Sequence, residues 1–104
     1  MIEAIRNCFR EDKAYYTAHA RTEMIGEESG VIADEEVSES IEAGEVIENY
    51  PDDEPFPSML IFGRTRRGRP LHVVCAYDRD DDLAIVVTTY EPDPAKWIDF
   101  KRRT

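Results

Sequence analysis

The chain has 104 residues, of which 41% are hydrophobic and 35% charged, and its formal net charge is −10. This length is typical of one domain that can bury its own core, so we expect a single domain over residues 1–104. Neither a run of roughly 18 apolar residues nor a signal-peptide pattern occurs, so we expect a cytoplasmic protein with no membrane partner.

Three helices are predicted in the first half of the chain. Residues 1–11 carry apolar side chains at helical spacing on one side. Thr17 can cap a second helix over roughly residues 18–27. Asp34 is a good N-cap for a third helix, and Gly44 supplies its end.

The second half is predicted to be rich in strands. A short β-prone run over residues 13–17 forms a strand or an extended entry to the second helix. Four further strands are predicted at Glu45–Tyr50, Ser58–Gly63, Leu71–Tyr77 and Leu83–Tyr90. Helices followed by a meander indicate an α+β fold, with N-terminal helices packed on a four-stranded, mostly antiparallel curved sheet. A final arm is expected to lay Trp97 and Phe100 on this sheet.

The charges are divided sharply between two parts of the sequence. From Glu23 to Glu54 there are thirteen acidic residues and no Lys or Arg, whereas the short turn from Arg64 to Arg69 holds four arginines and no acid. The average charge argues against non-specific nucleic-acid binding by the whole molecule, but it hides a local basic edge.

No metal site or cofactor is predicted. Cys8 and Cys75 lie in separate apolar blocks without C-x-x-C spacing, so they are expected to be reduced and buried. They do not combine with His19 and His72 at zinc-ligand spacing. The run Asp78–Asp82 lacks the glycine and terminal glutamate of a calcium loop, so a solvated turn is favoured.

Strand alternation places one histidine beside the arginine turn. If that turn centres on Arg67, His72 lies opposite Phe62, and Arg64 projects from the same face. A register slip of one residue would move Arg64 to the other side of the sheet.

The next turn sets the other neighbours of His72. If it centres on Asp80, Thr88 lies opposite His72 and Tyr90 lies diagonal to it on the same face. RNA cleavage without a metal needs a proton acceptor, a proton donor and a cation for the phosphate. Histidine can exchange the proton, arginine offers a fork of donors to phosphate, and tyrosine can donate to phosphate or stack on a base. The cluster therefore suggests RNA chemistry.

Structural interpretations compete with this one. A histidine on a half-buried strand and a tyrosine at a strand end often serve only the core, and an arginine turn often only protects a sheet edge. His19, followed by Arg21 at the start of the second helix, is another candidate for catalysis. A histidine bonded locally at a helix N-terminus is the alternative there.

Several motifs together resemble domain-of-unknown-function family 4258, which is widespread in prokaryotes. The matching stretches are His19-Ala20-Arg21 with Met24, Gly44–Glu48, Tyr50–Asp53, Gly68–Val74 and Tyr90–Pro94 with Trp97. On this resemblance residues 15–91 form the family domain, residues 1–14 an N-terminal helix and residues 92–104 a C-terminal arm.

The resemblance implies a distant similarity to the RelE/BrnT group of small toxins, whose relatives are often paired with zinc-ribbon, MqsA-like antitoxins. It marks His19, Arg69, His72 and Tyr90 as site positions. The chain departs from the family at Glu23, where an arginine is common, and Arg21 is the nearest replacement.

Two functions are therefore expected to compete. The first is a toxin that cleaves RNA without a metal, with four catalytic residues (His72, Arg69, Tyr90 and His19) and four RNA-binding arginines (Arg64, Arg66, Arg67 and Arg21). The second is a non-enzymatic interaction module that binds an acidic partner through the Arg64–Arg69 hairpin. The acidic stretch would repel RNA and could instead meet a basic antitoxin.

Overall fold

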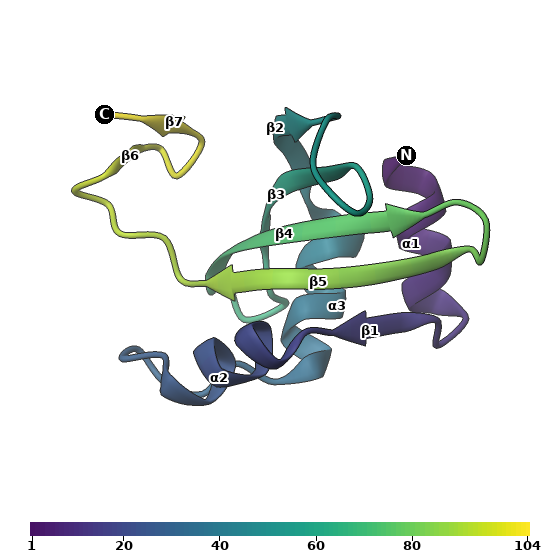
Figure 1. Ribbon diagram of the computed structural model, residues 1–104. Coiled ribbons are helices and arrows are strands. Elements are labelled where there is room, and N and C mark those ends of the chain that lie inside the picture. Colours follow the sequence, from purple (N-terminus) through teal and green to yellow (C-terminus); the bar gives the residue numbers. More distant parts are fainter.

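The computed structural model describes residues 1–104 and has an α+β fold, with three helices packed on a five-stranded mixed sheet and a small separate hairpin (Figure 1). The elements are α1 (Ile2–Arg10), β1 (Ala14–Tyr16), α2 (Ala18–Gly26), α3 (Asp34–Ala43), β2 (Glu45–Tyr50), β3 (Ser58–Arg64), β4 (Pro70–Asp78), β5 (Leu83–Tyr90), β6 (Trp97–Ile98) and β7 (Arg102–Arg103). The strand order in the large sheet is β1-β5-β4-β3-β2, and β6 pairs with β7. None of the helices is long and apolar enough to cross a membrane.

The helices begin and end close to the predicted positions. Thr17 caps α2, because its side chain accepts a hydrogen bond from the backbone N–H of Ala20. The N-cap of α3 is Ala33 rather than the predicted Asp34, which is the first helical residue. The side chain of Glu36 accepts the Ala33 N–H instead, so a carboxylate from inside the helix satisfies the exposed donor.

The sheet differs from the expected one in its strand count. Strands β2 to β5 form the predicted antiparallel meander, but β1 adds a fifth strand that pairs parallel to β5. The backbone bonds from Ala84 to Lys13 and from Thr17 to Val86 fix β1 at this edge. The prediction of four strands was therefore wrong, because the short run of residues 13–17 pairs along β5 rather than serving only as an entry to α2.

The register between strands confirms one expectation and corrects another. Phe62 lies opposite His72, as predicted. The residue opposite His72 on β5 is Tyr90 and not Thr88, which pairs with Val74. The turn pairs Asp78 with Leu83, so its centre lies one half-residue beyond Asp80 and the pairing is already shifted by one residue. A bulge next to Val74 shifts the pairing by one more. The two shifts together place Tyr90 instead of Thr88 opposite His72.

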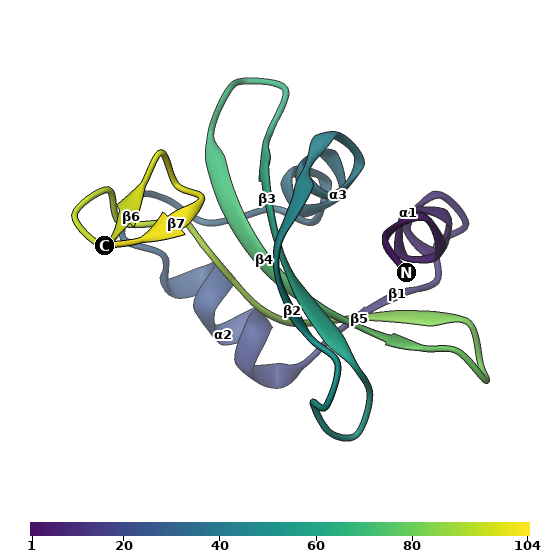
Figure 2. The same ribbon diagram turned by 90° about the horizontal axis from the view of Figure 1, so that it is seen from above.

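One face of the sheet packs against α1 and α3, which lie on the same side when the molecule is viewed from above (Figure 2). The buried core on this side is apolar and includes Ile5, Cys8, Val37, Ile41, Met59, Ile61, Leu71, Val73, Cys75 and Val86. Both cysteines are free and buried, as expected.

Helix α3 lies very close to β3 where the two elements cross. A Cβ atom at Gly63 would overlap the backbone of Ser40, and a Cβ atom at Gly44 would meet the same carbonyl. Glycine at these two positions lets the helix approach the sheet backbone directly.

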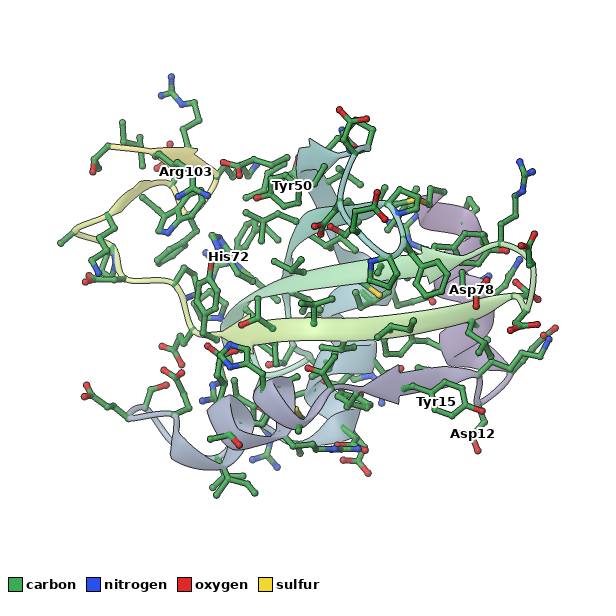
Figure 3. All side chains as sticks on the ribbon, in the orientation of Figure 1. Asp12, Tyr15, Tyr50, His72, Asp78 and Arg103 are labelled. Atoms are coloured by element: carbon green, nitrogen blue, oxygen red, sulfur yellow. The ribbon has the colours of Figure 1, made fainter.

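The opposite face of the sheet is covered only in part. The C-terminal arm with β6 and β7 lies over one end, and α2 runs beside β5 (Figures 1 and 2). A loop with three prolines, Pro51–Pro57, borders the other end of this face. Phe56 of this loop and Ala76 of β4 line a hollow there. His72 belongs to this face, at the end that the arm covers (Figure 3).

Candidate functional site

His72 is the centre of the predicted site, and aromatic rings enclose it. Its side chain is fully buried, with 0% exposed. The ring centroid of Trp97 lies 4.4 Å away, that of Tyr90 5.4 Å and that of Phe62 6.0 Å, all in edge-on arrangements. The sequence prediction that Trp97 lies on the sheet is confirmed, and its contact there is His72.

Both nitrogens of the imidazole have partners. Nε2 lies 2.6 Å from the carbonyl oxygen of Phe100, and Nδ1 lies 3.2 Å from the hydroxyl of Tyr90. Because a carbonyl oxygen can only accept, Nε2 carries the proton and donates it to Phe100, and Nδ1 accepts the hydroxyl proton of Tyr90.

Burial lowers the pKa of His72, although the bond to the Phe100 carbonyl and the charge of Glu48 act in the opposite direction. Burial also raises the pKa of Tyr90. The pair is therefore neutral near pH 7, and neither ring nitrogen is open to a substrate while the arm is in place.

The turn of the arm brings the Phe100 carbonyl to His72. Asp99 and Phe100 have φ values of 53° and 62°, in the left-handed region that side chains other than glycine rarely adopt. The backbone N–H of Lys101 donates to the carbonyl of Ile98 across this turn. The conformation costs on the order of 1 kcal/mol per residue, so surrounding contacts must hold it.

An ion pair and a stacking contact supply that support. Arg103 donates to both oxygens of Glu48 at 2.9 and 3.0 Å, and its guanidinium lies 4.7 Å from the ring centroid of Trp97. The hydroxyl of Tyr50 also donates to Glu48. Figure 3 shows Arg103, Tyr50 and His72 at the same end of the molecule.

The Arg64–Arg69 turn places three of its arginines in solvent. Arg64 lies over two rings, 5.7 Å from the centroid of Phe62 and 5.6 Å from that of Phe100, and donates to the Gly68 carbonyl. Arg64 therefore projects from the His72 face, as predicted. The Arg66 side chain is 87% exposed and makes one long ion pair, at 3.9 Å, with Glu39.

Arg69 does not join the His72 cluster. It donates from Nε to Glu91 at 2.9 Å, from one terminal nitrogen to Glu36 and the Val31 carbonyl, and from the other to Ser29 and the Gly30 carbonyl. Glu36 belongs to α3, Ser29, Gly30 and Val31 belong to the loop before it, and Glu91 follows β5; none of these residues contacts His72. Arg69 and His72, which were both expected to be catalytic residues, therefore do not contact each other.

The contacts of Arg69 have an electrostatic consequence. Burial alone would lower its pKa, but the hydrogen bonds to Glu91 and Glu36 outweigh this and raise the pKa. Every N–H group of the guanidinium points into the protein, so Arg69 cross-links the hairpin to the base of α3.

His19 and Arg21 lie apart from the arm. The His19 side chain is 68% exposed and its Nε2 lies 3.3 Å from Glu23, which also accepts the hydroxyl of Thr88. Arg21 pairs with Asp34 and stacks 3.9 Å above the ring of Tyr16. No contact joins His19 or Arg21 to His72, so the candidates are distributed over separate parts of the surface.

Residues of the arm were not predicted as part of the site. The pairing of Glu48 with Arg103 joins positions 55 residues apart, and no local pattern marks it. Nowhere in the structure do three or more His, Cys, Asp or Glu side chains gather in a way that could hold a metal ion.

The chain matches the family described as "Domain of unknown function (DUF4258)" over residues 16–91. No curated protein and no solved structure matches the chain. The matched segment runs from β1 to the end of β5 and contains His19, Arg69, His72 and Tyr90. Since it covers most of the sequence, the chain belongs to the DUF4258 family.

Proposed function

We propose that this chain is a protein-interaction module whose arginine hairpin, Arg64, Arg66 and Arg67, binds an acidic segment of a partner protein. The observation that supports it is the exposure of all three side chains at the tip of one hairpin. Neither Arg64 nor Arg67 has a carboxylate of this chain within ion-pair distance, and the pair of Arg66 is long. Their donors are therefore available to carboxylates of another molecule.

The hairpin is well ordered for such a role. The backbone N–H groups of Gly68 and Arg69 donate to the carbonyl and hydroxyl of Thr65, which is buried inside the turn. Arg69 ties the base of the turn to α3, and Arg64 is held against two aromatic rings. Little conformational freedom is lost when a partner binds to a turn that is already fixed.

We further propose that the partner is a small zinc-ribbon antitoxin of the MqsA type, the class that the resemblance to RelE/BrnT toxins implies. Helices before the antiparallel meander β2–β5 and the family motifs support this proposal. On this proposal the antitoxin brings an acidic segment to the hairpin, and both proteins act in the cytoplasm.

Metal-independent RNA cleavage is the second candidate. It is supported by the contact between His72 and Tyr90 and by the position of Arg64 on the same face. It requires the arm to leave, because the Phe100 carbonyl must release Nε2 before the imidazole can exchange a proton with RNA. Its RNA-binding arginines would be those of the hairpin, so the two candidates compete for one surface.

Fluorescence anisotropy separates the two candidates. A labelled oligoglutamate peptide and a labelled single-stranded RNA are titrated with the whole protein at low and moderate salt. We expect the peptide to bind, and Arg67→Ala to weaken it at least about threefold, with a larger loss in Arg66→Ala/Arg67→Ala. Arg79→Ala is the matched control, since Arg79 is an exposed arginine in the opposite turn. Equal binding by Arg67→Ala and Arg79→Ala, or no peptide binding at low salt, would contradict the proposal.

The nuclease is tested with the arm removed. A chain ending at residue 96 is incubated with RNA beside the full-length protein and beside a truncated His72→Ala variant. Cleavage by the truncated chain that His72→Ala abolishes would favour the nuclease. Intact RNA in all three reactions, with the truncated chain folded by circular dichroism, would exclude it.

A further inference from the structure

The face of the sheet that carries His72 has a second feature, an apolar strip that no helix covers. In Figure 1, β4 and β5 lie in front of α1 and α3, with no helix in front of them. Tyr15, Ile85 and Ala76 form one row across β1, β5 and β4, because each is paired with the next in the register. The Tyr15 side chain is 56% exposed, and Figure 3 shows it at the edge of this face.

A hollow of about 280 Å³ adjoins this row. It is lined by Ala76, Ile85 and Val87 of the sheet, by Pro55 and Phe56 of the proline-containing loop, and by Thr17. Ile85, Val87 and Phe56 are each only half-buried. Apolar surface of this kind on an otherwise well-packed domain is typical of an interaction site.

The rim of the hollow is acidic. Asp53 and Glu54 line it directly, and Asp52 precedes them on the same loop. Glu23 of α2 does not line the hollow, but it accepts the hydroxyl of Thr88, the residue after Val87. No lysine or arginine lines the hollow.

The loop that carries these acids is held in place. The hydroxyl of the buried Ser58 donates to Asp53 at 2.7 Å, and the backbone N–H of Tyr77 donates to the Pro57 carbonyl. Asp52 and Glu54 are exposed and form no ion pair. The ordered loop therefore keeps these charges near the apolar surface, and they are left without a cation of this chain.

We infer that this apolar face, Tyr15, Phe56, Ala76, Ile85 and Val87 with its acidic rim, docks a basic amphipathic segment of a partner protein. The apolar side chains of that segment lie on Ile85 and Val87, and its lysines or arginines face Glu54 and Asp52. The opposite signs of the two surfaces steer the segment and orient it. A second copy that docks through the same face fits poorly, because the two acidic rims would repel each other.

This surface is separate from the arginine hairpin and has the opposite charge preference. The test therefore uses a labelled peptide with leucines at helical spacing on one face and lysines on the other. A scrambled peptide of the same composition and a peptide with glutamate in place of lysine are the comparison probes. Binding to the whole protein is followed by anisotropy, and the footprint by amide hydrogen exchange.

Two matched pairs of variants locate the site. Glu54→Lys removes an acid from the rim, and Glu28→Lys makes the same change at an exposed acid outside it. Tyr15→Ser removes apolar surface from the face, and Val31→Ser does so at an exposed position of the loop before α3. We expect Glu54→Lys and Tyr15→Ser each to weaken the leucine–lysine peptide at least about fivefold, with little effect from their controls. Protection from exchange should centre on β5.

Several results would overturn the inference. Equal binding of the scrambled or the glutamate peptide would show that the amphipathic basic pattern is not recognised. Equal effects of Glu54→Lys and Glu28→Lys would show that only the net charge matters. Reversible dimerisation that Tyr15→Ser abolishes, measured by sedimentation, would assign the face to a second copy of the chain. Melting curves of all four variants confirm that each is folded before binding is compared.

Discussion

A 2.6 Å hydrogen bond from Nε2 of His72 to the carbonyl oxygen of Phe100 joins β4 to the left-handed turn of the C-terminal arm. The same ring accepts the hydroxyl of Tyr90 through Nδ1, so one imidazole connects two strands and the arm. A residue with this set of contacts stabilises the fold as a neutral group. It becomes available for proton transfer only when the arm moves.

The lowered pKa of His72 predicts how stability depends on pH. Below about pH 6.5 the unfolded chain binds a proton at this histidine before the folded chain does, so the free energy of unfolding falls as the pH drops through that window. The loss is at most about 1.4 kcal/mol per pH unit. Urea denaturation between about pH 7.5 and 5.5 measures it.

The two histidines of the chain provide a matched comparison. His72→Gln should flatten the pH dependence in this window, whereas His19→Gln at the exposed position should leave it in place. An NMR titration of the His72 ring gives a second readout that does not depend on a variant. A titration midpoint at or above the ordinary histidine value would contradict the prediction.

Arg69 and Arg67 are expected to differ sharply in their effect on stability. Arg69→Lys leaves Glu36, Glu91 and two carbonyls without their fork of donors, and the cost is on the order of 2 kcal/mol. Arg67→Lys, at an exposed position with no ion pair, should change stability by less than about 0.5 kcal/mol. Thermal and urea unfolding of both variants test this. Equal stability of the two would mean that the Arg69 contacts contribute nothing net.

The regular elements follow from local sequence patterns. Apolar spacing in residues 1–11, the Thr17 cap and strand alternation around His72 depend on neighbouring residues, and each predicted its element correctly. The arginine turn was also centred correctly, which put Arg64 on the His72 face. Such features are set by backbone periodicity and turn chemistry alone.

The errors come from features that depend on distant contacts. The position of the turn and the bulge near Val74 together moved Tyr90 opposite His72, and a bulge leaves no clear mark in a strand-like sequence. Arg69 turned towards α3 because Glu36 and Glu91 lie there, 33 and 22 residues away in the sequence. The burial of His72 depends on Trp97 and Phe100 from the arm, so its exposure could not be judged from β4 alone.

Gly63 is expected to tolerate no side chain. In Gly63→Ala the new Cβ would overlap the backbone of Ser40, and the helix α3 would have to move away from β3. Overpacking of this kind costs about 1–3 kcal/mol, and a backbone obstacle puts the change at the upper end. Gly26→Ala is the control, because that position has open space around it. A melting temperature for Gly63→Ala within a degree or two of the Gly26→Ala value would show that α3 is not constrained there.

The attachment of the arm is expected to depend on Trp97 more than on any exposed residue of the arm. Trp97 is buried, its ring centroid lies 4.4 Å from that of His72, and the guanidinium of Arg103 lies over its ring. Trp97→Ala therefore removes both contacts at once. The substitution removes about 3 kcal/mol of the free energy that holds this short arm on the sheet. We therefore expect the arm to open while the five-stranded sheet stays folded. Trypsin should then cut after Lys96 or Lys101 several times faster than in the unaltered protein, as followed by mass spectrometry. Ile98→Ala, at an exposed position of the same hairpin, should not change the cleavage rate. Equal acceleration by both variants would contradict the prediction, because the arm would then be released by any substitution in the arm and not by loss of the contact between Trp97 and His72.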